Sequence, residues 1–211
     1  MSYFLFTAVF RFISCGDEVF SRIAGKFTAA WQKGVPPIVH QIFEVKNESQ
    51  ERKWRTYRQR LSDKTIEEHF HGTKLSCNIA AIQAPCSDGN CGICGISCSG
   101  LDRTCIRKNI DFQRFGQGFY LAPHSSKCHD YTEGAHSYRA MLLCDVCPGK
   151  KYRLETNSQH RRGPPLGYDS VYGQVGSKLN YPEVVVYEPD AVIPRFIILY
   201  QKDGVVHPLS S

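Results

Sequence analysis

The sequence predicts an α+β fold for one domain. Two helical patterns stand between residues 17 and 61, and short β-branched or aromatic runs dominate the remainder of the chain. Helices grouped early and strands grouped late, without regular alternation, favour α+β over a doubly wound sheet. With 211 residues, 42% of them hydrophobic, the chain can bury one sizeable core. We expect a domain over residues 17–203, preceded by a segment 1–16 that is a strand or disordered, and followed by a tail 204–211.

Both expected helices have a recognisable start and an apolar stripe. The first covers Asp17–Gln32, where apolar residues recur at spacings of three and four and Asp17 can cap the amino end. The second covers Glu48–Leu61 after Asn47, with Trp54 on its buried stripe. The many charges of the second helix are most simply its solvated face.

Strands are expected where β-branched and aromatic residues cluster between turn residues. A strand or short helix over Thr65–Phe70 would deliver His71. The other expected strands are Ile38–Val45, Phe119–Ala122, Arg139–Val146, Tyr168–Val171, Glu183–Tyr187 and Phe196–Tyr200. We expect a helix over Lys127–Tyr138 and a surface loop over the polar, proline-containing segment Leu154–Gly167.

The net charge of +6 limits the function classes only weakly. It suits an anionic ligand such as a dinucleotide, or a loose attraction to nucleic acid. A dedicated nucleic-acid binder is disfavoured, because no long basic stripe with interleaved aromatic residues is visible. The sequence contains no apolar run of about 18 residues, so it predicts no membrane-spanning helix. Residues 3–13 are apolar but interrupted by Arg11 and lack a basic start, so we expect an intracellular protein, nuclear or cytoplasmic.

The residues that suggest chemistry lie in four separate segments. His71 stands in His-Phe-His-Gly-Thr at 69–73, and Tyr120 follows the glycine turn at 116–118. Tyr131 ends the run Ser-Ser-Lys-Cys-His-Asp-Tyr at 125–131, and Glu183 opens an apolar run. Each residue alone has a structural explanation, as a core histidine or tyrosine or a strand-end charge. The ordered set is what predicts a site assembled by folding.

This ordered set resembles the His-Tyr-Glu signature of the poly(ADP-ribose) polymerase catalytic domain, which cleaves NAD and transfers its ADP-ribose. The resemblance extends from the first helix to Tyr200. It implies the ADP-ribosyltransferase fold, in which two small mixed or antiparallel β-sheets form an NAD cleft flanked by N-terminal helices. It also implies NAD as substrate and a protein acceptor, including the chain itself, with a nucleic-acid acceptor possible. Mono-transfer and poly-transfer both stay open.

The resemblance implies a role for each residue of the set. His71 would hold the adenosine-side ribose, and the backbone of Gly72 would bind the nicotinamide carboxamide. Tyr120 and Tyr131 would sandwich the nicotinamide ring, whose positive charge suits an aromatic face. Glu183 would hydrogen-bond the nicotinamide-side ribose and stabilise the oxocarbenium-like transition state.

Two neighbouring residues qualify this assignment. Lys127 stands where members that build polymers often carry a lysine. Cys128 stands where the family usually has a serine that binds the carboxamide, and a thiol is a weaker hydrogen-bonding group. The departure keeps an alternative open, a non-catalytic module that binds NAD, ADP-ribose or RNA on the same fold. The stretch from Asp102 to Gln117 would be the donor loop over the NAD.

Six of the ten cysteines fall between residues 77 and 105. A domain of this size needs no disulfide framework, so crowded thiols indicate a metal site. We expect a structural zinc ion held by four thiolates, those of Cys77, Cys86, Cys91 and Cys94. Cys98 or Cys105 could replace Cys77, and buried free thiols or a Cys91–Cys94 redox disulfide are the competing interpretations. Fungal and plant members of the family are similar in carrying cysteines at this point.

Overall fold

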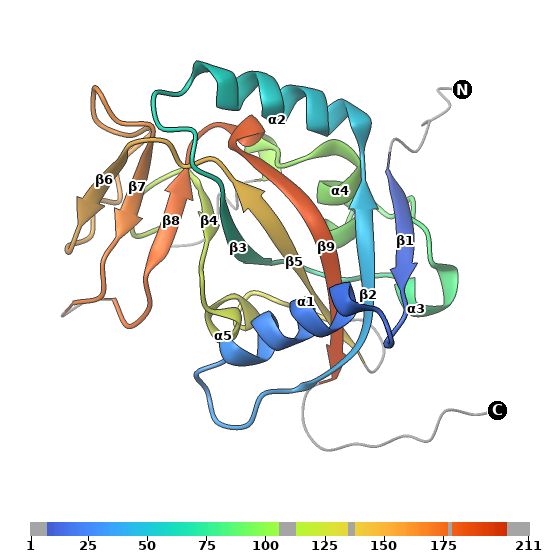
Figure 1. The fold of residues 1–211 in the computed structure, drawn as a ribbon. Helices are drawn as coiled ribbons and strands as arrows, with labels where there is room; N and C mark the ends of the chain where they lie inside the picture. Colours follow the sequence, from blue (N-terminus) through green and yellow to red (C-terminus); the bar gives the residue numbers. More distant parts are fainter. Residues whose placement is uncertain (1–7, 106–112, 135–137, 177–178, 202–211) are drawn as a thin grey trace.

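The computed structural model describes residues 8–105, 113–134, 138–176 and 179–201, and it has the predicted α+β architecture. Two sheets, one of five strands and one of four, lie side by side (Figure 1). Residues 106–112 of the expected donor loop and the expected tail 204–211 lie outside the described residues. No described helix is long and apolar enough to cross a membrane.

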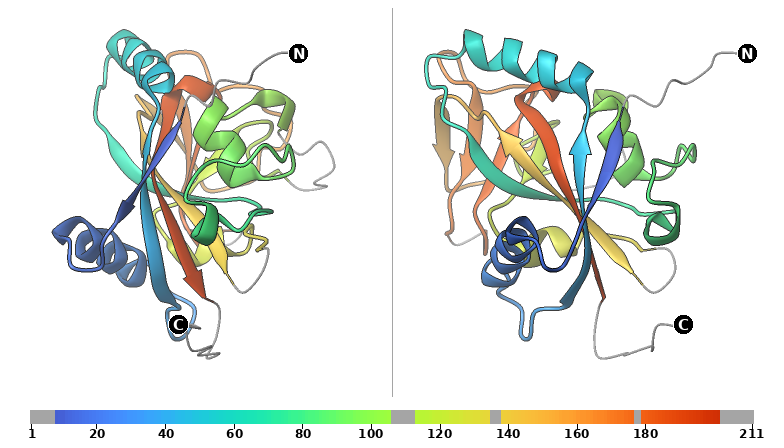
Figure 2. Two further views of the ribbon diagram at one scale, coloured as in Figure 1. Left: turned by 90° about the vertical axis from the view of Figure 1, so that its right-hand side faces the viewer. Right: turned by 45° about the vertical axis from the view of Figure 1, so that its right-hand side comes forward.

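The five-stranded sheet has the order β1-β2-β9-β5-β3, with every neighbouring pair antiparallel. Its strands are β1 (Val9–Ile13), β2 (Ile38–Lys46), β9 (Val192–Gln201), β5 (Arg139–Val146) and β3 (Glu67–Gly72). Each face is covered by a different part of the chain, with α1 (Glu18–Ala29) on one side and α4 (Gly92–Ser99) on the other (Figure 2). Two separate hydrophobic clusters result, one on each face.

The four-stranded sheet has the order β4-β8-β7-β6, with β6 and β7 parallel and the other pairs antiparallel. Its strands are β4 (Phe119–Leu121), β8 (Glu183–Val186), β7 (Ser170–Gly173) and β6 (Lys151–Leu154). The two sheets meet where Phe70 and Ala122 exchange backbone hydrogen bonds of 2.8 and 3.1 Å. This junction places the end of β3, which carries His71, beside Tyr120 of β4.

The two long helices form where the sequence predicts them, within a few residues at each end. Asp17 caps α1 by accepting a hydrogen bond from the Val19 amide at 2.8 Å. Asn47 caps α2 (Glu48–Arg60) in the same way, from the Gln50 amide at 3.1 Å. Such caps satisfy backbone N–H groups that have no partner within the helix.

The helix expected over Lys127–Tyr138 is wrong. The structure has only α5 (Ser125–His129), after which the chain turns. The cause is tertiary, because the carbonyl of Glu133 accepts a hydrogen bond from the Leu75 amide at 2.7 Å in a parallel bridge. Glu133 therefore has an extended pairing with the segment after β3, and it cannot also belong to a helix.

Two strands also differ from expectation. β6 was not expected, because it is only four residues long, two of them charged, at the edge of its sheet. β9 starts at Val192 rather than Phe196 and contains Pro194. The pairing of β5 with β9 is irregular between Leu143 and Cys144, beside that proline, and such an irregularity accommodates a residue without a backbone donor. The remaining short elements are α3 (Ile79–Ile82), η1 (Arg103–Cys105) and η2 (Pro189–Ala191).

Candidate functional site

His71 and Tyr120 are joined by a hydrogen bond across the junction of the two sheets. The Nδ1 atom of His71 lies 3.0 Å from the carbonyl oxygen of Tyr120. A carbonyl only accepts, so Nδ1 carries the hydrogen and Nε2 of the neutral ring is an acceptor. Burial lowers the pKa of His71, against the opposing effect of this hydrogen bond. The ring therefore presents an acceptor suited to a sugar hydroxyl.

We expect His71 to titrate below its ordinary pKa of about 6.5. The unfolded chain then binds this proton more readily than the folded protein does. The contribution of the neutral ring to stability is therefore complete above the unfolded pKa and is lost as the pH falls below it. Histidine NMR titration measures this directly, and a midpoint for His71 at or above that of an unfolded peptide would contradict the assignment.

Gly72 occupies a position where no side chain fits. A Cβ at Gly72 would lie 1.9 Å from the carbonyl oxygen of Cys128 and 3.3 Å from the Cβ of Tyr131. The end of β3 therefore lies directly against α5 and the turn after it. This close approach explains the glycine of the His-Gly-Thr motif and places Tyr131 beside Gly72.

Substituting Gly72→Ala should lower the free energy of unfolding by more than about 2 kcal/mol, because backbone must move to relieve the clash. Binding of a benzamide-like nicotinamide mimic should fall with it. Thermal denaturation and calorimetry measure the two effects. Gly25→Ala is the matched control, since Gly25 lies within α1 with nothing within 4 Å of an added Cβ. That variant should gain stability, by about 0.5–1 kcal/mol.

The glycine turn before β4 is organised by the hydroxyl of Tyr120. This hydroxyl accepts a hydrogen bond from the Phe115 amide at 3.0 Å and donates one to the Gly116 carbonyl at 2.8 Å. Gly116 has a φ of +77°, and a Cβ there would meet the Arg161 carbonyl oxygen at 1.9 Å. Burial raises the pKa of Tyr120, which keeps its hydroxyl protonated. The hydroxyl is thus used for structure, and the ring is what Tyr120 can offer a ligand.

Lys127 links Tyr131 to Glu183. Its Nζ lies 5.4 Å from the centroid of the Tyr131 ring and 3.1 Å from Oε1 of Glu183. Burial opposes the charge on Lys127, but the nearby Glu183 carboxylate outweighs it and raises the pKa of the lysine. Tyr131 itself is 46% exposed. An ionised pair and an open aromatic face therefore stand together.

Glu183 is a buried carboxylate with one oxygen unused. The residue is 4% exposed and opens β8 opposite Gly173. Lys127 contacts Oε1, whereas Oε2 has no hydrogen-bond partner in the part of the chain that the structure describes. Leaving a buried carboxylate oxygen without a partner costs free energy, about 1–3 kcal/mol or more for a charged group. This oxygen can accept a hydrogen bond from a bound ligand or water.

Cys128 lies beside this group but turns its sulfur into the core. Its thiol donates to the Phe70 carbonyl at 3.1 Å, within the hydrophobic cluster that includes Phe27. Burial raises the pKa of Cys128 to about 12, so it stays a thiol. The structure therefore brings together His71, Gly72, Tyr120, Lys127, Cys128, Tyr131 and Glu183. Their roles toward NAD, that of Cys128 in particular, stay predictions.

Four cysteine sulfurs converge near the end of the His-Gly-Thr segment. The sulfurs of Cys77, Cys86, Cys91 and Cys94 all lie within 4.8 Å of one another. Cys77 is 3.7 Å from Cys94 and 3.8 Å from Cys91. A tetrahedral ion with metal–sulfur bonds of about 2.3 Å needs sulfurs about 3.8 Å apart. The four thiols therefore fit one metal ion.

The geometry of the thiol cluster bears on the other ligand sets and on the disulfide that the sequence left open. Cys98 is not part of it, and the side chain of Cys105 lies outside the described residues. The described cysteines form no disulfide, so the Cys91–Cys94 bridge is absent from this structure. The S–H contact from Cys94 lowers the pKa of Cys91, which favours a thiolate at that position.

The thiol cluster is packed onto the segment that leaves His71. The Ile93 amide donates to the Lys74 carbonyl at 3.1 Å. A Cβ at Gly92 would lie 2.1 Å from Oγ1 of Thr73, the residue after Gly72. The linear sequence indicated a cluster near the donor loop, and the direct contact with the His-Gly-Thr segment emerges from the fold.

Three further residues, Lys33, His124 and Tyr181, lie near α5 and the start of β8, and the sequence assigned no role to them. The Nζ of Lys33 is 6.0 Å from the Tyr181 ring centroid, and it pairs with Asp130 at 2.6 Å. The rings of His124 and Tyr181 are 5.7 Å apart between centroids. Tyr181 stands two residues before Glu183, which was the available signal.

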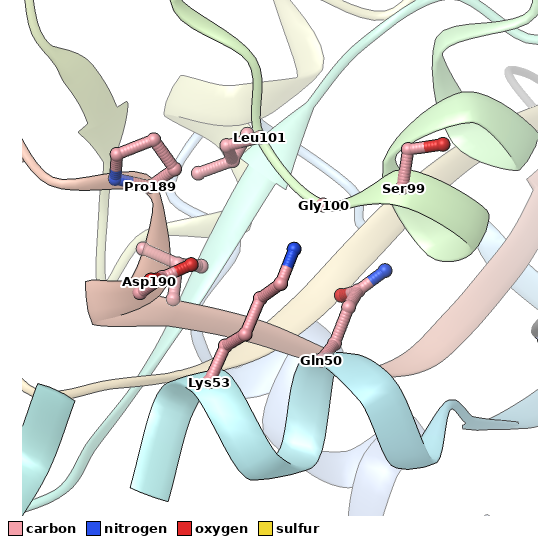
Figure 3. A pocket seen from close by; sticks show the side chains of 8 residues that line it. Gln50, Lys53, Ser99, Gly100, Leu101, Pro189 and Asp190 are labelled. Atoms are coloured by element: carbon pink, nitrogen blue, oxygen red, sulfur yellow. The ribbon is translucent and has the colours of Figure 1, made fainter. Parts of the chain in front are cut away.

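A cavity of about 210 Å³ lies elsewhere, between α2, the end of α4 and η2 (Figure 3). Its lining includes Gln50, Lys53, Leu101 and Asp190. None of the predicted NAD-binding residues or cluster cysteines lines it. The cavity is therefore separate from the candidate site.

Comparisons with known proteins identify the family of this chain. Residues 17–203 match the family model of the poly(ADP-ribose) polymerase catalytic domain. The protein mono-ADP-ribosyltransferase PARP4 of Homo sapiens is 30% identical over 124 residues, which cover 53% of this chain and 7% of the relative. The human protein mono-ADP-ribosyltransferase PARP3 is 36% identical over 62 residues, 28% of this chain and 12% of the relative. The chain thus spans a small part of the length of these relatives. Because the family model covers most of the chain, this protein belongs to the poly(ADP-ribose) polymerase catalytic-domain family.

Proposed function

We propose that the protein is an ADP-ribosyltransferase that cleaves NAD at the nicotinamide–ribose bond and transfers ADP-ribose to a protein acceptor. The observation that carries the proposal is the buried Oε2 of Glu183, which has no hydrogen-bond partner among the described residues. It stands 4% exposed beside a lysine and an open tyrosine ring. A ribose hydroxyl would supply the missing donor.

The proposed chemistry depends on how charge moves as the glycosidic bond of NAD breaks. As the bond between the ribose anomeric carbon and the nicotinamide nitrogen breaks, positive charge develops on the ribose and nicotinamide leaves neutral. The Glu183 carboxylate would stabilise that charge and hold the ribose hydroxyl. The oxygen of an acceptor hydroxyl then bonds to the anomeric carbon, and its proton passes to the Glu183 carboxylate or to water. His71 would orient the other ribose through Nε2.

Aromatic rings and backbone would position the leaving group. The rings of Tyr120 and Tyr131 would hold the nicotinamide between them, since a cationic ring is attracted to an aromatic face. The Gly72 backbone would bind its carboxamide. With Lys127 and Glu183 both present, transfer of one ADP-ribose or of several is chemically open, and an intracellular site of action fits this use of NAD.

We also propose that the thiol cluster holds a structural zinc ion. Four sulfurs at the spacing of a tetrahedral site fill the coordination shell and leave no position for a reacting water. Zinc would supply rigidity here and no chemistry of its own. Its function would be to hold Thr73 and Lys74, and through them the His71 strand, in place.

Incubation with NAD labelled in the adenosine half tests the enzymatic proposal. We expect release of nicotinamide and label on protein, either on the chain itself or on an added acceptor. Tight NAD binding in calorimetry, with neither release nor label, would identify a non-catalytic module instead. An absence of both binding and release would reject the NAD site.

A further inference from the structure

Two tyrosines and two cations form a cluster at the outer edge of the four-stranded sheet. The ring centroids of Tyr152, on β6, and Tyr168, before β7, lie 5.0 Å apart in an edge-to-face arrangement. Arg161 lies over the Tyr152 ring at 5.4 Å, and Lys150 lies over the Tyr168 ring at 4.8 Å. We call Lys150, Tyr152, Arg161 and Tyr168 the tyrosine–cation cluster. None of these residues belongs to the proposed NAD site.

Strand register places this cluster on the same sheet face as the candidate site. Tyr120 pairs with Val185, Val185 with Val171, and Val171 with Tyr152. Paired residues on neighbouring strands point to the same face, so Tyr152 shares a face with Tyr120 three strands away, about 14 Å at the usual strand spacing. The Arg161 carbonyl also accepts a hydrogen bond from the Gln117 amide at 3.0 Å, in the glycine turn before Tyr120.

The segment carrying the cluster concentrates positive charge. Residues 150–172 contain five lysines and arginines and two carboxylates, a net +3 and thus half of the +6 of the whole chain. One of the two carboxylates, Asp169, accepts a hydrogen bond from the Lys150 amide at 2.8 Å. The Nε of Arg161 is buried without a hydrogen-bond partner among the residues that the structure describes. The cluster therefore combines an exposed lysine and a half-buried arginine with two half-buried aromatic rings.

We propose that the tyrosine–cation cluster is a binding surface for single-stranded nucleic acid. Lys150 and Arg161 would contact phosphates, and unpaired bases would stack on Tyr152 and Tyr168 or on the Arg161 guanidinium plane. Stacking on aromatic rings tolerates any base, and a backbone-following positive charge supplies most of the remaining affinity. The bases of a duplex are paired and cannot stack on the tyrosines, so a duplex would be bound only through its phosphates and the two cations. This surface goes beyond the proposed transfer reaction and does not depend on NAD turnover.

Fluorescence anisotropy with a labelled single-stranded oligothymidine of about ten nucleotides tests the proposal. We expect a Kd in the micromolar range at low salt, and weaker binding to a duplex of the same length. Tyr168→Leu should weaken single-strand binding about tenfold, while Tyr168→Phe, which keeps the ring, should not. The double variant Lys150→Gln, Arg161→Gln should also lower the dependence of log K on log salt by about 1.4, the value for two phosphate contacts on a single strand.

Arg153→Gln is the matched control. Arg153 lies on the same strand as Tyr152 but on its opposite face, 5.5 Å from the Tyr172 ring. It removes one positive charge, as each half of the double variant does, and should change single-strand affinity by less than about twofold. Equal losses for Arg153→Gln and the double variant, or equal binding of single strand and duplex, would overturn the proposal. So would binding of ADP-ribose polymer without binding of the oligonucleotide. Nicotinamide release by Tyr168→Leu should match wild type, which separates this test from the test of NAD cleavage.

Discussion

Glu183→Gln should reduce nicotinamide release and ADP-ribose transfer by about a thousandfold, the scale seen when one preorganised transition-state contact is removed. Glutamine keeps the size of the side chain and an oxygen for Lys127, so the fold should persist. What it loses is the negative charge opposite the developing positive charge on the ribose. Steady-state kinetics with NAD, together with calorimetry using a nicotinamide mimic, should show a large fall in kcat and a small change in affinity.

Glu188→Gln is the control for this variant. Glu188 lies just after the same strand, and its side chain is 58% exposed beside Arg103. An exposed pair of this kind contributes little, so activity should stay within about twofold of wild type. If Glu183→Gln released nicotinamide at the wild-type rate, Glu183 would have no catalytic role, and the explanation of its unpartnered oxygen would be wrong.

Removing the metal proposed for the thiol cluster should lower the melting temperature by about 10 °C. That shift corresponds to a loss of about 4 kcal/mol in a domain of this size, a moderate value for a closed four-thiolate site. The double variant Cys91→Ser, Cys94→Ser should reproduce it, because it removes two of the four sulfurs. NAD affinity should fall as well, since the cluster packs against Thr73 beside Gly72. Elemental analysis before and after chelation measures the metal content, thermal denaturation measures the melting temperature, and calorimetry with NAD measures the affinity.

Cys15→Ser separates loss of metal from general thiol chemistry. Cys15 is exposed and lies outside the cluster, so its replacement should leave both metal content and melting temperature unchanged. Cys98→Ser tests the composition of the site, because Cys98 is not among the four converging sulfurs. Metal loss in Cys98→Ser would contradict the assigned ligand set, and purified protein without bound zinc would contradict the site itself.

Sequence patterns predicted those parts of the fold that depend on interactions between residues close together in the chain. Asp17 and Asn47 cap their helices because a short polar side chain can reach backbone amides within the next turn. The helix expected after Lys127 failed because Glu133, several residues farther on, pairs with a strand extension far away in sequence. β6 escaped notice because its alternation of charged and apolar residues lasts for only four positions, the shortest run that can mark a strand. Both differences arise from long-range pairing.

The candidate site shows the same division between local and long-range information. The linear chain contains the ordered residues His71, Gly72, Tyr120, Tyr131 and Glu183 and the spacing of the cysteines, and these suffice to predict the fold class, an NAD site and a metal site. Four features depend on folding: the Lys127–Glu183 pair, the unpartnered oxygen of Glu183, the contact of Gly72 with the Cys128 carbonyl, and the tyrosine–cation cluster. The contacts among these features join residues 9 to 56 positions apart in the sequence. Residue types determine which chemistry is available, whereas burial and the approach of distant backbones determine which atoms meet and which remain without a partner.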